Sequence, residues 1–104
     1  MAKFVLAYKG GGAPASDADR EAVMAAWGNW FGELGQAVLD PGNPFAASMS
    51  VAADGALSDG ASSGVSGYSI LTAEDLGGAA ELAKGSPILA NGGSVEVHEV
   101  HDVM

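Results

Sequence analysis

The chain contains no cysteine among its 104 residues. It therefore forms no disulfide and offers neither a thiol nucleophile nor a thiolate ligand for a metal ion. Disulfide-free chains suit a reducing compartment. We expect a cytoplasmic protein with no bound cofactor or metal.

Positive charge is also scarce, because 13 acidic residues face only four basic ones and the net charge is −9. Nucleic-acid affinity depends mainly on cations that neutralise phosphates, and binding to an anionic membrane surface depends on the same charge. The basic residues are scattered along the chain, at Lys3, Lys9, Arg20 and Lys84. We therefore expect no nucleic-acid partner and no membrane partner, and the acidity favours solubility.

Long apolar runs are missing as well. No stretch approaches the roughly 20 residues of a membrane-spanning helix. The apolar run at 4–8 stops at Lys9 and a group of glycines, which makes it too short for a signal peptide. The length predicts one domain, 1–104, with a modest core.

The order of apolar segments and turn residues predicts a β-α-β-β-α-β chain. Ser16 is a suitable N-cap for the first helix and Gly35 a suitable stop, with a loop at 10–16 before it. Thr72 is expected to cap the second helix at 73–84, with Asp75 at the capping-box position. The strands are expected at 4–8, 45–53, 65–71 and 94–100, and a loop or ragged hairpin at 54–64.

The first helix carries a concentrated set of large apolar residues. Trp27 and Trp30 are accompanied at helical spacing by Val23, Phe31 and Leu34, which predicts one buried face. An indole can also form the wall of a ligand pocket and supply one N–H donor. Core packing against the sheet and a ligand-binding role therefore both stay open for the two tryptophans.

This element order predicts a four-stranded antiparallel sheet with both helices on one face, a ferredoxin-like α+β sandwich. The opposite face then carries residues such as Tyr8, Tyr68 or Ile70, depending on register. An apolar sheet face without a covering layer implies a partner. A second copy is the simplest partner, and two facing sheets would form a dimeric α+β barrel.

The chain resembles the YCII-related family of small bacterial proteins. The resemblance lies in the segments 27–35, 40–44, 67–70, 83–89 and 92–97, which follow in the family's order over almost the whole length. It implies a homodimer with a cleft between the sheet and the partner. Some members carry a histidine and an aspartate there for suspected acid–base work. That pair does not transfer, because the only histidines here are His98 and His101. The Asp-Gly-Pro-Phe motif of another branch is also absent.

Asp40 and Tyr68 are candidates for chemistry in such a cleft. Asp40 can act as a general base or can order the Asp40-Pro41-Gly42-Asn43-Pro44 turn through its own side chain. Tyr68 can donate a proton or a hydrogen bond, or can serve only as an apolar interface residue.

Glu96 and His98 lie two residues apart on the last predicted strand, so their side chains share one face. They can form an acid–base pair or a simple ion pair on an exposed strand. Val95 and Val97 would then pack under the helices. His98 and His101 have opposite parity and make a poor metal site, and we expect His101 and Asp102 to belong to a frayed tail.

The sequence favours a homodimer that binds a small molecule in a cleft between two sheets. One alternative is an enzyme of acid–base or hydrolytic type that uses Asp40, Tyr68, Glu96 or His98. Another is a subunit or regulatory protein that binds no ligand.

Overall fold

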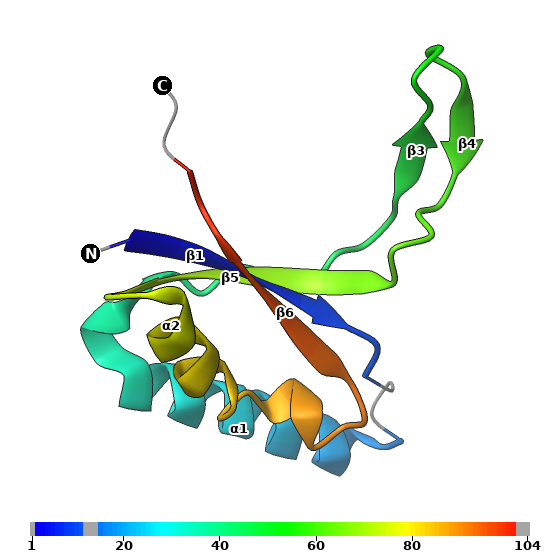
Figure 1. Ribbon diagram of the computed structural model, residues 1–104. Coiled ribbons are helices and arrows are strands. Elements are labelled where there is room, and N and C mark those ends of the chain that lie inside the picture. The colour runs from blue at the N-terminus through cyan, green and yellow to red at the C-terminus, as the bar shows by residue number, and fades with distance from the viewer. Residues whose placement is uncertain (1, 12–14, 102–104) are drawn as a thin grey trace.

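The computed structural model describes residues 2–11 and 15–101. The protein is a small α+β structure with a four-stranded antiparallel sheet in the order β2-β5-β1-β6. Helices α1 and α2 both lie on one side of this sheet (Figure 1). The bounds are β1 Ala2–Lys9, α1 Asp17–Leu34, β2 Val38–Asp40, β5 Val65–Ala73, α2 Leu76–Ala83 and β6 Ser94–Glu99. Of the expected loop at 10–16, residues 12–14 lie outside the described residues.

The two central strands alternate between a buried and a half-buried face. Phe4, Leu6 and Tyr8 of β1 are buried toward the helices, whereas Val5 and Ala7 between them are only half-buried. The apolar run at 4–8 therefore belongs to a central strand, but one covered on a single side. Tyr8 lies on the helix side. The expectation that it is among the residues of the uncovered face is therefore wrong, whereas Tyr68 and Ile70 have the opposite parity.

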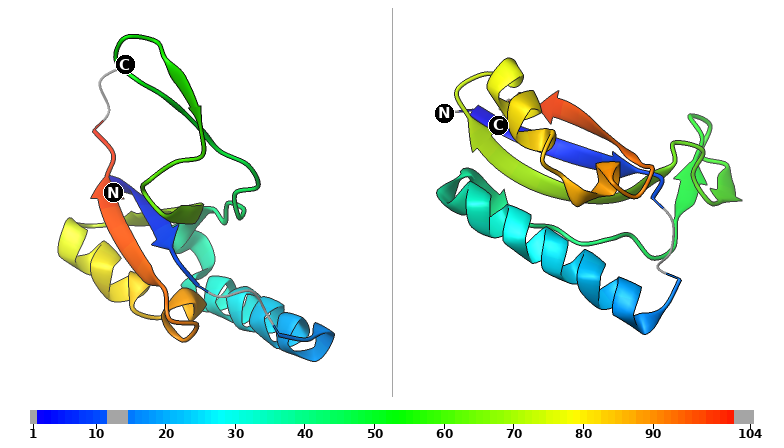
Figure 2. Two further views of the ribbon diagram at one scale, coloured as in Figure 1. Left: turned by 90° about the vertical axis from the view of Figure 1, so that its right-hand side faces the viewer. Right: turned by 90° about the horizontal axis from the view of Figure 1, so that it is seen from below.

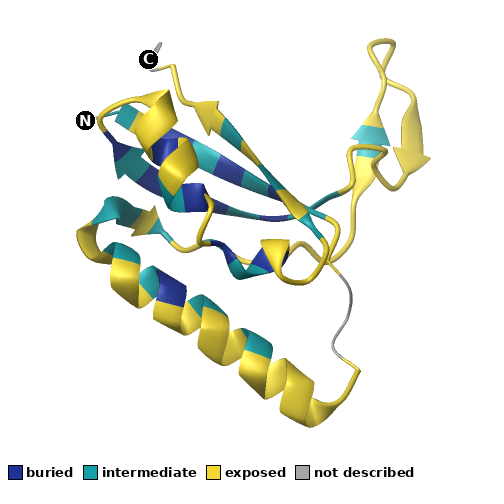
Figure 3. Ribbon diagram, turned by 60° about the horizontal axis from the view of Figure 1, so that its bottom comes forward, coloured by how far each residue is buried: buried dark blue, intermediate teal, exposed yellow. Residues whose placement is uncertain are grey.

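Helix α1 begins and ends where the capping residues predict. Ser16 is the N-cap, and its Oγ accepts a hydrogen bond from Asp19 N at 3.1 Å. Gly35, with a φ of 57°, ends the helix and leads into a short 3₁₀ helix, η1 (Gly35–Ala37). Trp30 is the buried residue of α1, and the rest of the predicted apolar face is half-buried (Figure 3).

The second strand differs from the prediction. β2 (Val38–Asp40) takes the place beside β5, and no residue of 45–53 belongs to a strand of the main sheet. The turn after β2 packs against β5 and extends the pairing along this edge of the sheet. Phe45 N donates to Ser66 O at 2.8 Å, and Pro44 forms an isolated bridge with Gly67. The residues after Phe45 leave the main sheet.

Those residues form a separate two-stranded ribbon instead. β3 (Met49–Val51) pairs with β4 (Leu57–Asp59) in antiparallel fashion. The hairpin therefore begins inside the segment 45–53, which was expected as a strand of the main sheet, and only its second strand lies in the expected loop or hairpin at 54–64. We call residues 48–60 the arm. It stands away from the sheet on the side opposite the helices (Figures 1 and 2).

Helix α2 begins later than expected because β5 is longer than expected. β5 pairs with β1 as far as Ala73, opposite Ala2. Thr72 is therefore a strand residue, and its expected capping role is wrong. The N-cap is Asp75, whose Oδ1 accepts a hydrogen bond from Gly78 N at 2.7 Å. After α2, a short 3₁₀ helix, η2 (Pro87–Leu89), leads to β6.

The core lies between the sheet and the two helices (Figure 3). Its larger cluster of buried residues joins Leu6, Tyr8, Trp30, Leu71, Ala83 and Ile88, and Val95 and Val97 of β6 pack against it as predicted. A smaller cluster holds Phe4, Ala73 and Ala79. Residues of the opposite parity on β1, β5 and β6 point away from the helices. We call that side of the sheet the open face.

Candidate functional site

The register of the strands places four of the candidate residues on or beside the open face. Ala7 pairs with Glu96 on one side and with Tyr68 on the other. In the next row Val5 pairs with His98 and Ile70, and Ile70 pairs in turn with Asp40. Adjacent strands lie about 4.8 Å apart, so the backbones of Glu96 and Tyr68 are about 10 Å apart with only the Ala7 methyl group between them.

At one end of this face Asp40 and Tyr68 meet. Asp40 Oδ1 accepts a hydrogen bond from Gly42 N at 2.9 Å, which orders the turn, and its Oδ2 lies 3.5 Å from the Tyr68 hydroxyl. The Phe45 ring stacks on the Tyr68 ring, with centroids 5.7 Å apart. Asp40 thus caps its own turn, as one of the two sequence interpretations predicts, and also keeps one carboxylate oxygen next to the Tyr68 hydroxyl.

The turn is held tightly against β5. Gly42 has a φ of 70°, and a Cβ at this position would overlap the carbonyl group of Tyr68. A Cβ at Gly67 would come within 3.1 Å of Asn43 O. These glycines allow the backbone of the turn to approach the strand that carries Tyr68.

At the other end of the open face lies a group of three charged or titratable side chains. Glu96 accepts from Lys9 Nζ at 3.4 Å, and its second carboxylate oxygen lies 3.2 Å from His98 Nε2. The hydrogen bond with His98 and then the contact with Lys9 lower the pKa of the Glu96 carboxyl below its usual value. The predicted pairing of Glu96 and His98 is confirmed. An ionised carboxylate beside an imidazole is an arrangement that can hold and transfer a proton.

A buried hydrogen-bond chain lies on the helix side of the same strands. Tyr8 OH donates to Ser69 Oγ at 2.8 Å, and Ser69 Oγ donates to Pro41 O at 2.7 Å. Burial raises the pKa of Tyr8 to about 12, against a smaller opposing effect of the Ser69 hydrogen bond. The chain joins β1 and β5 to the turn after Asp40. Sequence reasoning missed it, although the shared parity of Tyr8 with Phe4 and Leu6 is the signal that could have found it.

Trp27 and Trp30 lie on the helix side, across the sheet from Tyr68. The Trp27 ring meets the Tyr8 ring edge-on with centroids 4.9 Å apart, and Trp30 is only 5% exposed within the core. The two tryptophans and Tyr68 therefore do not share one binding surface.

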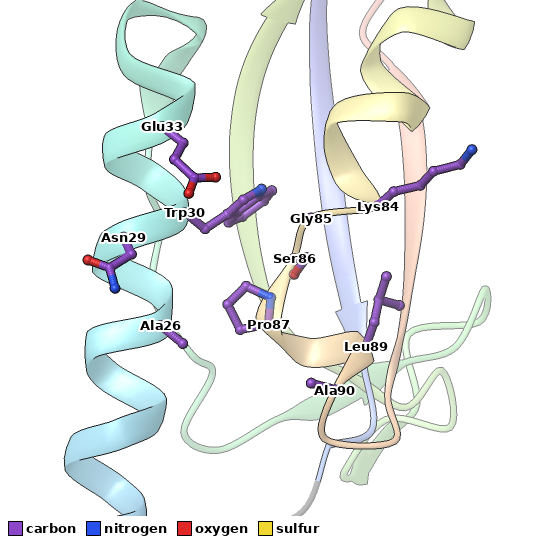
Figure 4. A pocket seen from close by; sticks show the side chains of 10 residues that line it. All are labelled: Ala26, Asn29, Trp30, Glu33, Lys84, Gly85, Ser86, Pro87, Leu89 and Ala90. Atoms are coloured by element: carbon purple, nitrogen blue, oxygen red, sulfur yellow. The ribbon is translucent and has the colours of Figure 1, made fainter.

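A groove of about 570 Å³ lies between α1 and the segment that follows α2 (Figure 4). Trp30 reaches from α1 toward Gly85, where a Cβ would come within 2.8 Å of the indole nitrogen. Lys84 at its rim is bonded to Glu81 at 2.9 Å. The groove is lined by Ala26, Asn29, Trp30, Glu33, Lys84, Gly85, Ser86, Pro87, Leu89 and Ala90. Of these residues, only Trp30 was a candidate binding residue from the sequence.

His101 is exposed at the end of the described chain, and Asp102 lies outside it. Among residues 2–11 and 15–101, no three or more His, Cys, Asp and Glu side chains gather closely enough to hold a metal ion. None of the helices in the described part of the chain has both the length and the apolar character needed to cross a bilayer.

In comparisons with known proteins, no family model and no curated sequence matched the chain.

Proposed function

We propose that the protein is a homodimer that binds a small molecule between the open faces of its two sheets. The observation that carries this proposal is the apolar centre of the open face. Val5, Ala7, Tyr68 and Ile70 are half-buried there, and both helices lie on the other side (Figure 1). A sheet face that is exposed to solvent normally carries polar side chains. The apolar centre of this face therefore favours a partner that covers it.

The surface area of the chain supports the same proposal. The accessible surface is 6862 Å². A compact monomer of 10.3 kDa is expected to expose about 5,400 Å², so the chain exposes about 1,500 Å² more. A standard interface buries about 800 Å² per partner, and the excess is therefore large enough to supply one.

We assign the main sheet to the ferredoxin-like class. Counting only its four strands along the chain, the spatial order is 2-3-1-4, with one helix in each of the two crossovers. The arm is then an insertion between the second and third strands. Two such sheets facing one another would form a dimeric α+β barrel, the assembly that the resemblance to the YCII-related family implies.

Two segments that carry this family resemblance contact each other. Tyr68 N donates to Asn43 O at 3.4 Å, and Gly67 forms its bridge with Pro44. The Asp40-to-Pro44 turn thus bears directly on the strand that faces the proposed cleft, which supports a shared role for both segments.

The ligand would have an apolar body with polar groups at its ends. The body would lie over Ala7 and Val5, which are short enough to leave the neighbouring polar side chains accessible. Tyr68 and Asp40 would bind one end, and Glu96, His98 and Lys9 the other. This division follows the two polar clusters on either side of the apolar centre.

An enzyme of acid–base type is the second candidate, and the 3.2 Å contact between Glu96 and His98 favours it. His98 would transfer the proton, Glu96 would orient the imidazole, and Tyr68 or Asp40 would hold the substrate from the opposite end. A regulatory subunit without a ligand would need the dimer but not the polar clusters.

The test is the oligomeric state of an open-face variant. The wild type is expected to sediment as a dimer at micromolar concentration, and Ile70→Glu as a folded monomer, because the added carboxylate cannot be buried between two apolar faces. Leu89→Glu, at an exposed position on the helix side, is the matched control and should stay dimeric. Circular dichroism checks that both variants fold.

A wild-type monomer at these concentrations would contradict the proposal. If the dimer forms, a crystal structure of it distinguishes the candidate functions. A cavity lined by Tyr68, Glu96 and His98 is expected, and an interface filled by side chains alone would instead indicate the regulatory subunit.

A further inference from the structure

In the described part of the chain, the arm forms hydrogen bonds only within itself. Gly60 N, for example, donates to Ser48 O at 2.9 Å, and Ala52 N donates to Ala56 O at 2.8 Å. A single two-stranded hairpin is only marginally stable in water. An arm of this kind gains a fixed structure when another surface packs against it.

The arm has an apolar face that is exposed. Its register pairs Val51 with Leu57 and Met49 with Asp59, so these four side chains share one face of the ribbon, and the Ser50–Ser58 pair occupies the other. Met49, Val51 and Leu57 are 60%, 68% and 67% exposed. An amphipathic ribbon with its apolar side in water is typical of a surface that a partner covers.

We propose that the partner is a second copy of this chain, and that each arm packs its apolar face against the other subunit and clasps the dimer. The inference deepens the proposed function and rests on it. The arm rises on the open-face side of the sheet (Figure 1), so a copy seated on the open face lies alongside it. Two-fold symmetry repeats this contact, and each subunit both gives and receives an arm.

The charge distribution agrees with a second copy as the occupant. Residues 46–64 contain Asp54 and Asp59 and no lysine or arginine. Two of the four basic residues of the chain, Lys3 and Lys9, occupy β1 positions with the parity of the open face. Lys9 is already paired with Glu96 at 3.4 Å, so of these two cations Lys3 is the one that the acidic arm of the other subunit would meet.

Protection of a single thiol tests the clasp. The chain has no cysteine, so Leu57→Cys introduces one unique thiol on the apolar face of the arm. Its reaction rate with a maleimide is measured across the monomer–dimer transition. We expect the rate to fall at least tenfold in the dimer. The matched control is Met24→Cys on α1, at a position that is 68% exposed on the helix side, and its rate should not change.

A second measurement removes the apolar face. The triple variant Met49→Ser, Val51→Ser, Leu57→Ser should weaken dimerisation at least tenfold by sedimentation equilibrium, and Met24→Ser should leave it unchanged. Because the three side chains are exposed in the single chain, the thermal unfolding of the monomeric form should not shift.

The outcomes separate the two proposals. A wild-type dimer would leave the proposed function standing, but the clasp would be overturned if the thiol of Leu57→Cys stays fully reactive in the dimer and the triple variant dimerises normally. The clasp would also be overturned if that thiol stays protected when Leu57→Cys is combined with Ile70→Glu in a monomer, because the arm would then be folded onto its own sheet. A monomeric wild type would overturn both proposals.

Discussion

Individual side chains connect the two sides of the sheet. Tyr8 belongs to the core through its ring and to the candidate site through its hydroxyl, because the chain from Tyr8 through Ser69 ends on the carbonyl of Pro41, next to Asp40. The Asp40 carboxylate in turn reaches the open face at Tyr68. The hydroxyl pair buried on the helix side thus anchors the residue that directly follows Asp40.

The pH dependence of stability should report the burial of Tyr8. Its pKa is raised to about 12 in the folded state, from 10.0 in an unperturbed tyrosine. The folded state thus holds the proton of Tyr8 more tightly than the unfolded state does. The resulting contribution of Tyr8 to the free energy of unfolding is complete below pH 10 and is lost as the pH rises from 10 through 12. The loss amounts to at most about 2–3 kcal/mol of unfolding free energy.

Urea denaturation of the wild type and of Tyr8→Phe between pH 7 and 12 measures this effect. Above pH 10, the free energy of unfolding should fall less steeply with pH for Tyr8→Phe than for the wild type. At pH 7 the variant should be less stable by about 1 kcal/mol, because it lacks the hydrogen bond to Ser69. Equal slopes for the two proteins would mean that the Tyr8 hydroxyl is not buried.

The helices and strands show which sequence signals were sufficient to predict an element and its ends. Helix α1 was predicted well because both of its ends are set by local chemistry, at Ser16 and Gly35. The second strand was predicted wrongly because several short segments competed for the edge of β5. Val38–Asp40 takes that edge since it carries Val38 and leads directly into the turn that packs on Gly67. Such a competition is decided by long-range packing rather than by local propensity.

Helix α2 offers a test at this scale. Asp75→Ala should destabilise the protein by about 1 kcal/mol, because Asp75 Oδ1 caps the first turn of a helix that begins with Leu76-Gly77-Gly78. Asp75→Asn keeps the acceptor and should cost much less. Chemical denaturation compares both with Thr72→Ala, the residue that the sequence suggested as the cap. A cost of Asp75→Asn as large as that of Asp75→Ala would contradict the capping role.

The whole molecule is broad and thin, with principal extents of 44 × 40 × 18 Å. Its radius of gyration is 15.1 Å, whereas a compact chain of this length is expected to have about 13 Å. The arm and the uncovered sheet face both contribute to this extended shape. Both belong to the side on which we propose that the second copy binds.

The net charge makes a further prediction for the assembly. Two chains of charge −9 repel one another, and salt screens that repulsion. If the interface is mainly apolar, raising the salt concentration from about 0.02 M to about 0.5 M should lower the dissociation constant of the dimer severalfold. Sedimentation equilibrium over this range measures the dissociation constant. A dimer that weakens with added salt would point to an interface held by ion pairs, against an apolar one.

The sequence by itself determined the α+β composition, the ends of α1 and the shared face of Glu96 and His98. These features follow from residue periodicity and from capping groups that act within a few positions. Only the tertiary structure decided which segment lies beside β5, which face receives Tyr8, and that 48–60 leaves the sheet as an arm. Each of those outcomes depends on contacts between distant residues, such as the turn at Gly42 with Tyr68 and Tyr8 with Ser69, which no local pattern specifies.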